Sequence, residues 1–152
     1  MKLCVFLWAC ALMAQNSRFL GVWKLVSYEL RTPDGKVTQP MGPNPVGRIT
    51  YDSEGRMSAQ LMDPRRAKFG SSLLRNGTAA EKAAAADGYA AYYGRFTVRE
   101  KEGIVVHHVD ASLFPNWVGG DQIRYFEFSG GRLILRAKRD TGESRLVWER
   151  DR

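Results

Sequence analysis

The chain has 152 residues, 44% of them hydrophobic and 26% charged, which is the composition of one globular domain and excludes a disordered or fibrous protein. Its 23 basic and 16 acidic residues give a net charge of +7, but the basic residues occur in almost every segment. A nucleic-acid-binding surface concentrates them on one face or helix, so we expect a solvated basic surface and no nucleic-acid partner. The net positive charge is still compatible with an acidic ligand.

The first fourteen residues resemble a secretory signal peptide. Lys2 is followed by an apolar run that ends at Ala14, and this run is too short for a membrane span of ~20 residues. Export to the periplasm or medium is one interpretation, and a cytoplasmic protein with a disordered leader is the other. Both cysteines, Cys4 and Cys10, lie in this segment, so no disulfide scaffold is expected in the folded part.

From residue 19 onward, short β-rich runs alternate with Gly, Pro and Asp turn signals. Eight strands are predicted, at residues 19–31, 46–52, 56–62, 92–100, 104–113, 122–128, 132–138 and 143–150. Tight turns between successive strands favour antiparallel neighbours, and eight such strands close into an up-and-down barrel. We therefore predict one all-β barrel domain over residues 19–150, with a two-sheet sandwich as the alternative.

One helix is predicted between the third and fourth strands. Thr78-Ala79-Ala80-Glu81 has the pattern of a capping box, and the alanine-rich sequence after it favours a helix to about Ala91. Asn76-Gly77-Thr78 is also a glycosylation sequon, but we favour capping as the role of Thr78.

Several motifs resemble the bacterial and fungal lipocalin-like domain family. The first strand contains Gly21-Val22-Trp23, which matches the Gly-x-Trp signature of lipocalins. The likeness extends through PVGRITY (45–51), GRMSAQ (55–60), VHHV (106–109), SLFPNWVG (112–119) and LVWER (146–150). The resemblance implies an eight-stranded calyx that binds a small, largely apolar molecule. It also implies that Arg150 packs on Trp23 and closes the base of the barrel.

The only histidines, His107 and His108, are adjacent in a predicted strand and must point to opposite faces. A two-residue turn at Glu102-Gly103 would pair Val98 with His107 and place His107 inside, whereas a three-residue turn would place His108 inside. The inner histidine is either a pocket group that binds or deprotonates a ligand or a hydrogen-bonded core residue. Two histidines on opposite faces cannot chelate one ion, so no metal is expected.

Seven further residues are candidates for lining a central cavity. Arg124 suits a planar anion such as a carboxylate or enolate, unless it faces solvent. Trp117 lies in a loop at one rim, where it would act as a lid or a plug. The full set is Tyr51, Gln60, Tyr92, Phe96, Asn116, Trp117 and Arg124, and plain core packing is the alternative for the strand residues.

The sequence contains no nucleophile elbow and no phosphate-cradling glycine-rich loop, so no cofactor is expected. The leading hypothesis is a barrel that binds a small hydrophobic or amphipathic metabolite in its central cavity. The alternative is a cofactor-independent isomerase, cyclase or lyase acting on a carbonyl compound. In that case His107 or His108 would be the acid/base, and Arg124 or Tyr51 would stabilise an oxyanion. A third possibility is an interaction module without a pocket.

Overall fold

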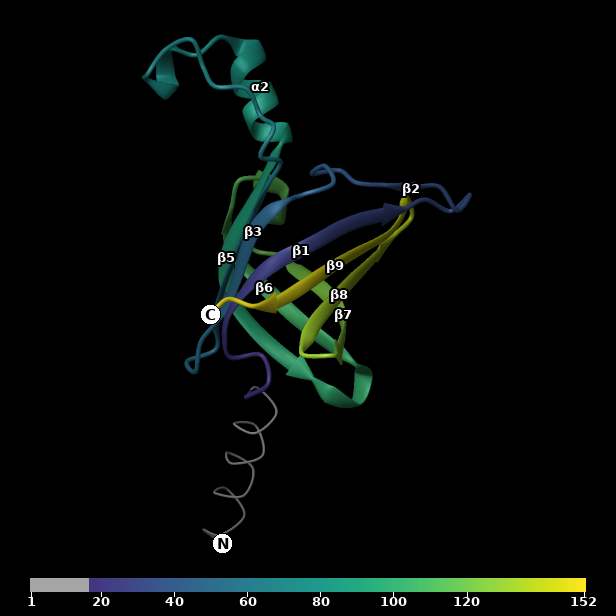
Figure 1. The fold of residues 1–152 in the computed structure, drawn as a ribbon. Helices are drawn as coiled ribbons and strands as arrows, with labels where there is room; N and C mark the ends of the chain where they lie inside the picture. The colour runs from purple at the N-terminus through teal and green to yellow at the C-terminus, as the bar shows by residue number, and fades with distance from the viewer. Residues whose placement is uncertain (1–16) are drawn as a thin grey trace, which may run out of the picture.

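A computed structural model describes residues 17–152, and the candidate signal peptide at residues 1–14 lies outside them. Eight long antiparallel strands form a closed barrel, since each pairs with the next and β1 also pairs with β9 (Figure 1). They are β1 (Gly21–Arg31), β3 (Val46–Tyr51), β4 (Arg56–Met62), β5 (Tyr89–Arg99), β6 (Ile104–Ser112), β7 (Asp121–Ser129), β8 (Arg132–Arg139) and β9 (Gly142–Arg150). The two-residue β2 (Val37–Thr38) pairs with the end of β1. The predicted up-and-down barrel is confirmed, and a two-sheet sandwich is excluded.

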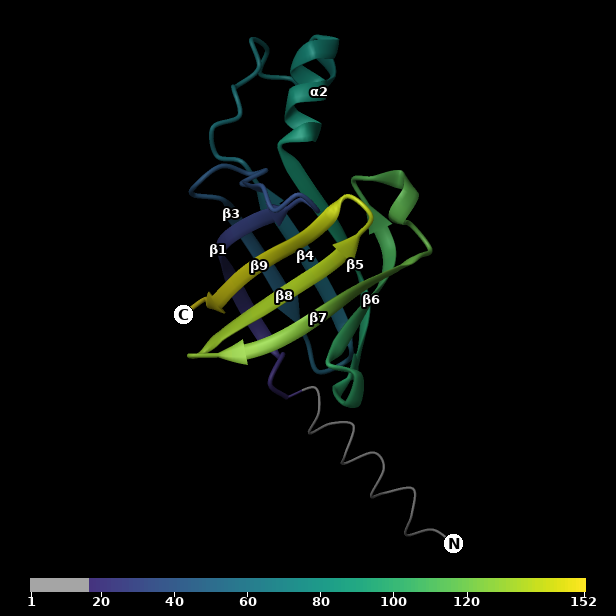
Figure 2. The same ribbon diagram turned by 90° about the vertical axis from the view of Figure 1, so that its right-hand side faces the viewer.

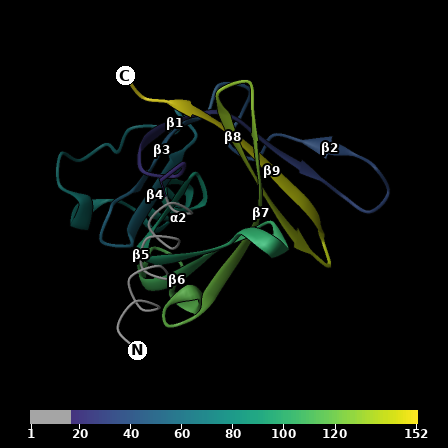
Figure 3. The same cartoon turned by 90° about the horizontal axis from the view of Figure 1, so that it is seen from below.

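The core follows from the period-two alternation of side chains along the strands. In β4, Met57, Ala59 and Leu61 are buried inside the barrel, while the residues between them are more exposed. Seen from below, the strands surround one common interior (Figure 3). That interior is therefore the place where a core or a ligand must lie.

Aromatic side chains fill one end of the barrel, which we call the closed end. Phe19, just before β1, is fully buried there and makes edge-on contacts with the rings of Phe126 and Phe128 at 5.0 Å. Arg150 lies 3.8 Å from the ring of Trp23 and donates to the carbonyl oxygens of the segment before β1. The pairing of Arg150 with Trp23 that the resemblance implied is present.

Loops and the helix surround the opposite end, which we call the mouth. The helix α2 (Ala79–Asp87) and the 3₁₀ turn η1 (Leu74–Asn76) project beyond the barrel, and α2 has no buried residue (Figure 2). The capping box is present, since Glu81 N donates to Thr78 Oγ1 at 3.2 Å and Thr78 N donates to Glu81 Oε2 at 2.7 Å. No helix within residues 17–152 is long and apolar enough to span a bilayer.

The helix is shorter than expected because β5 begins earlier. Residues 89–91 pair with the end of β4, so the predicted continuation of the helix to Ala91 is wrong. Gly88 ends the helix, and the ladder to β4 then supplies the hydrogen bonds that a longer helix would have made.

The register between β5 and β6 also differs from the expectation. A 3₁₀ turn, η2 (Glu100–Glu102), connects them and pairs Val98 with Val105 and Phe96 with His107, so the predicted pairing of Val98 with His107 is wrong. The error is two residues, which preserves the face of each side chain. His107 therefore points inward and His108 outward.

Candidate functional site

A cavity of about 100 Å³ occupies the mouth half of the barrel interior. Its wall is mainly apolar and aromatic, with two arginines, Arg124 from β7 and Arg139 from the end of β8. The other lining residues are Tyr28, Met41, Ile49, Ala59, Leu61, Ala90, Tyr92, Trp117, Leu135, Ser144, Leu146 and Trp148. An apolar wall with a few placed polar groups is typical of small-molecule sites.

A buried chain of three polar side chains lies between the packed closed end and this cavity. Tyr51 Oη is 2.8 Å from His107 Nε2, and Tyr92 Oη is 2.9 Å from His107 Nδ1. The three residues come from different strands. Tyr51 is the last residue of β3, and Tyr92 and His107 lie on the paired strands β5 and β6, so the closed barrel brings their side chains together in its interior. Only Tyr92 of the three also lines the cavity.

All three groups are neutral near pH 7. Burial lowers the pKa of His107 well below its ordinary value, and the charges of Arg124 and His108 lower it further. Burial raises the pKa of Tyr51 well above the ordinary value for a phenol. Burial also raises the pKa of Tyr92, although the nearby charge of Arg124 opposes the shift.

A neutral imidazole has one N–H donor and one acceptor nitrogen, so the chain has two proton arrangements. In one, Tyr51 donates to Nε2, and the Nδ1–H donates to Tyr92. In the other, Tyr92 donates to Nδ1, and the proton of Tyr51 points into a wall that includes the rings of Phe19 and Phe96. An unpaired buried donor costs about 1–3 kcal/mol, so the first arrangement is favoured.

The favoured arrangement leaves the hydroxyl proton of Tyr92 free. The oxygen of Tyr92 then accepts from His107. Because both ring nitrogens of His107 are then occupied, Tyr92 can satisfy its own O–H only by donating to something in the cavity. The floor of the cavity therefore presents a hydrogen-bond donor to any occupant.

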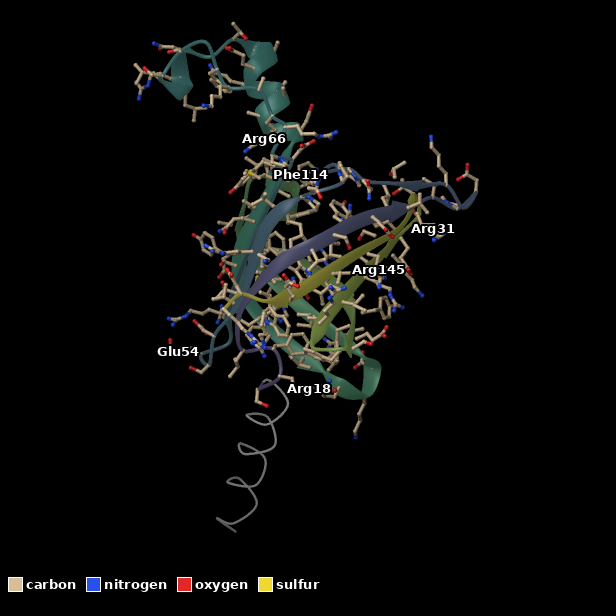
Figure 4. The ribbon with its side chains drawn as sticks, viewed as in Figure 1. Arg18, Arg31, Glu54, Arg66, Phe114 and Arg145 are labelled. Atoms are coloured by element: carbon tan, nitrogen blue, oxygen red, sulfur yellow. The ribbon has the colours of Figure 1, made fainter. Side chains whose placement is uncertain are left out.

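Trp117 separates the inner cavity from a groove on the mouth. It lies in the 3₁₀ turn η3 (Pro115–Trp117), 5.5 Å from the ring of Tyr92 and 5.7 Å from that of Phe114. Trp117 and Ala90 line both the inner cavity and an outer groove of about 220 Å³ beside α2. Figure 4 shows Phe114 at this end of the barrel and Arg18 at the other. Movement of the Trp117 ring would join the two spaces.

The predicted site residues fall into three groups. Tyr92, Trp117 and Arg124 line the cavity, while Tyr51, Phe96 and His107 are buried inside the barrel beyond its lining. Gln60 and Asn116 are exposed. Their assignment to the cavity is wrong, because Gln60 alternates with the inward residues of β4 and Asn116 is on the solvent side of η3.

Sequence reasoning missed four wall residues that carry polar atoms, which are Tyr28, Arg139, Ser144 and Trp148. Leu133, Leu135 and Ala137 are buried, and continuing that alternation by one step places Arg139 on the inner face. This signal was present in the sequence, but Arg139 stood within a cluster of basic residues that indicated a surface.

The outward histidine belongs to a separate, exposed cluster. His108 Nδ1 is 2.7 Å from Asp121 Oδ1, and His108 Nε2 is 2.9 Å from Thr97 Oγ1. Within residues 17–152, no three His, Cys, Asp or Glu side chains gather as metal ligands would.

Comparison with protein families places this geometry in context. The model of the lipocalin-like domain matches residues 20–151. The chain belongs to the lipocalin-like domain family. The match covers all eight barrel strands and every residue of the cavity wall.

The chain is also similar to a curated protein and to solved structures. The chain is 38% identical over 85 residues to the 4'-hydroxy-3'-methoxypropiophenone carrier protein ppsC of Aspergillus oryzae (strain ATCC 42149 / RIB 40), an alignment that covers 52% of this chain and 77% of that protein. A lipocalin-like protein from Bacteroides uniformis ATCC 8492 is 13% identical, with a TM-score of 0.47, 89% of this chain covered and 100% of that chain. A designed fluorescence-activating β-barrel is 15% identical, with a TM-score of 0.44, 90% of this chain covered and 98% of that chain.

Proposed function

We propose that this lipocalin-like barrel binds and carries a small aromatic molecule in the cavity at its mouth. The observation that carries the proposal is the cavity wall, in which aromatic and aliphatic side chains surround a donor on Tyr92 and the guanidinium of Arg124. The carrier protein of Aspergillus oryzae, whose name specifies an aromatic ketone, supports the same class of ligand.

The size of the cavity also fits a small ligand. A dry cavity of about 150 Å³ holds benzene, so about 100 Å³ holds a polar group and part of a ring. The rest of the molecule would displace the ring of Trp117 and extend into the adjoining groove of about 220 Å³. Together the two spaces reach the lower end of the range for ligand pockets, roughly 300 Å³.

The burial of the three polar groups favours carriage over catalysis. A general acid or base is most effective when its pKa is near the working pH. Burial moves the pKa of His107 down and those of Tyr51 and Tyr92 up, away from neutrality. These groups hold a fixed pattern of hydrogen bonds and are poorly suited to exchanging protons with a substrate.

A fluorescence titration with 4'-hydroxy-3'-methoxypropiophenone tests the proposal. Trp117 and Trp148 line the cavity, so a bound aryl ketone should quench their emission in a saturable way, and mass spectrometry should recover it unchanged. Ala59→Leu adds volume inside the cavity and should weaken binding, whereas Ser58→Leu, on the opposite face of the same strand, should not. No saturable binding to the folded protein, or equal effects of the two variants, would refute carriage in this cavity.

A further inference from the structure

The two cavity arginines have no ionic partner among residues 17–152. Arg124 donates to Ile123 O at 3.0 Å and to Gln122 Oε1 at 3.3 Å, and the guanidinium of Arg139 lies 5.7 Å from the Trp117 ring. Within residues 17–152, neither forms an ion pair, and no carboxylate lines the cavity. The arginines that do pair with a carboxylate lie mostly on the outer surface, for example Arg56 and Arg136.

A positive charge inside a largely apolar wall is costly unless an opposite charge meets it. Arg124 is half-buried and acts electrostatically on all three members of the chain formed by Tyr51, His107 and Tyr92. The fold therefore concentrates positive potential at the floor of the cavity. The favourable occupant of that position is an anionic oxygen.

The hydrogen-bond donors at the same wall point to the same chemistry. Tyr92 has a hydroxyl proton that needs an acceptor, and Arg124 adds guanidinium N–H groups. The indole Nε1 of Trp148, a residue that also lines the cavity, is buried with no hydrogen-bond partner. Ser144 is the one aliphatic hydroxyl in the wall. The polar atoms near the cavity are thus mostly donors, and a carboxylate or phenolate offers only acceptors.

We propose that the cavity selects a small aromatic anion, whose carboxylate or phenolate oxygen lies between Arg124 and the hydroxyl of Tyr92, with Arg139 at the entrance. This deepens the proposed carrier function and rests on it. The aromatic ring would pack toward Trp117 and the apolar wall, so charge and ring are recognised at different depths. A neutral isostere would leave Arg124 without its partner.

Benzoate and benzamide are matched probes, because they share one shape and differ in charge. Isothermal titration at constant ionic strength should show benzoate binding about 10- to 100-fold more tightly, the range expected for hydrogen bonds to charged groups. Arg124→Met should abolish most of that difference and leave the affinity for benzamide nearly unchanged. Arg132→Met removes the same charge from an exposed position at the start of β8 and should change neither. 4-Nitrophenolate compared with 4-nitroanisole distinguishes a phenolate from a carboxylate site.

The outcomes separate the two proposals. Equal affinities for benzoate and benzamide, or a difference that survives Arg124→Met, overturn the anion site while carriage of the aryl ketone stands. If neither the ketone nor any of these probes binds, the carrier function itself fails. Should Arg124→Met not fold, Tyr92→Phe and Arg139→Met each provide the same comparison and should each reduce the preference for benzoate.

Discussion

The buried His107 makes the stability of the barrel depend on pH. Burial lowers its pKa in the folded protein, so below about pH 6.5 the unfolded chain binds a proton that the folded chain does not. The free energy of unfolding must then decrease as the pH is lowered. For a histidine that ionises only when unfolded, the loss between about pH 7.5 and about pH 5.5 is about 1.4 kcal/mol, and it continues at lower pH until the folded pKa is reached.

Urea-induced unfolding at the two pH values measures this loss, and His107→Gln removes its source. The variant should be less stable at the higher pH by about 1–3 kcal/mol, because the glutamine amide does not place its donor and acceptor where both ring nitrogens of His107 lie. Its further loss on acidification should nearly vanish. His108→Gln, at the half-buried neighbour that faces outward, is the matched control and should keep the full loss. If His107→Gln still loses about 1.4 kcal/mol, the reasoning from burial is wrong.

Three further variants test the architecture around the site. Arg150→Met removes the cation–π contact and the carbonyl contacts at the closed end, and it should lower stability by about 1–3 kcal/mol in a thermal melt. Gly94→Ala would place a methyl group 1.8 Å from the carbonyl oxygen of His108. It should destabilise the barrel strongly, whereas Gly120→Ala, 3.5 Å from its nearest neighbour, should not. Thr78→Ala removes the helix cap, worth about 1 kcal/mol, yet α2 buries nothing. Hydrogen exchange in α2 should therefore accelerate while the melting temperature is unchanged.

The barrel was predictable because its information is local. Turn signals separate the strands, and alternation assigns the faces of Met57, Ala59 and Leu61. The capping pair Thr78 and Glu81 predicts the start of the helix without any other information. Each of these signals spans only a few residues. Closure then follows from the need to pair every strand edge.

The site was less predictable because it depends on registers and irregularities. A β-bulge opposite Gly94 shifts the pairing of β5 with β6. No residue pattern in β6 predicts this bulge. The contact of Tyr51 with His107 joins residues 56 positions apart, and only the closed barrel brings them together. Gln60 was misplaced for a different reason, since the alternation already assigned it to the outer face.

The division of the barrel into a packed end and a hollow end explains why so few residues define the site. Phe19 and its aromatic neighbours occupy the interior as far as His107, and beyond it the side chains no longer meet. A buried imidazole needs two partners, and the structure provides one from each side of this boundary. The partner on the packed side is satisfied by His107 alone, so the unsatisfied proton falls on Tyr92, at the floor of the cavity. The need to pair a core histidine thereby creates the donor that a ligand would meet.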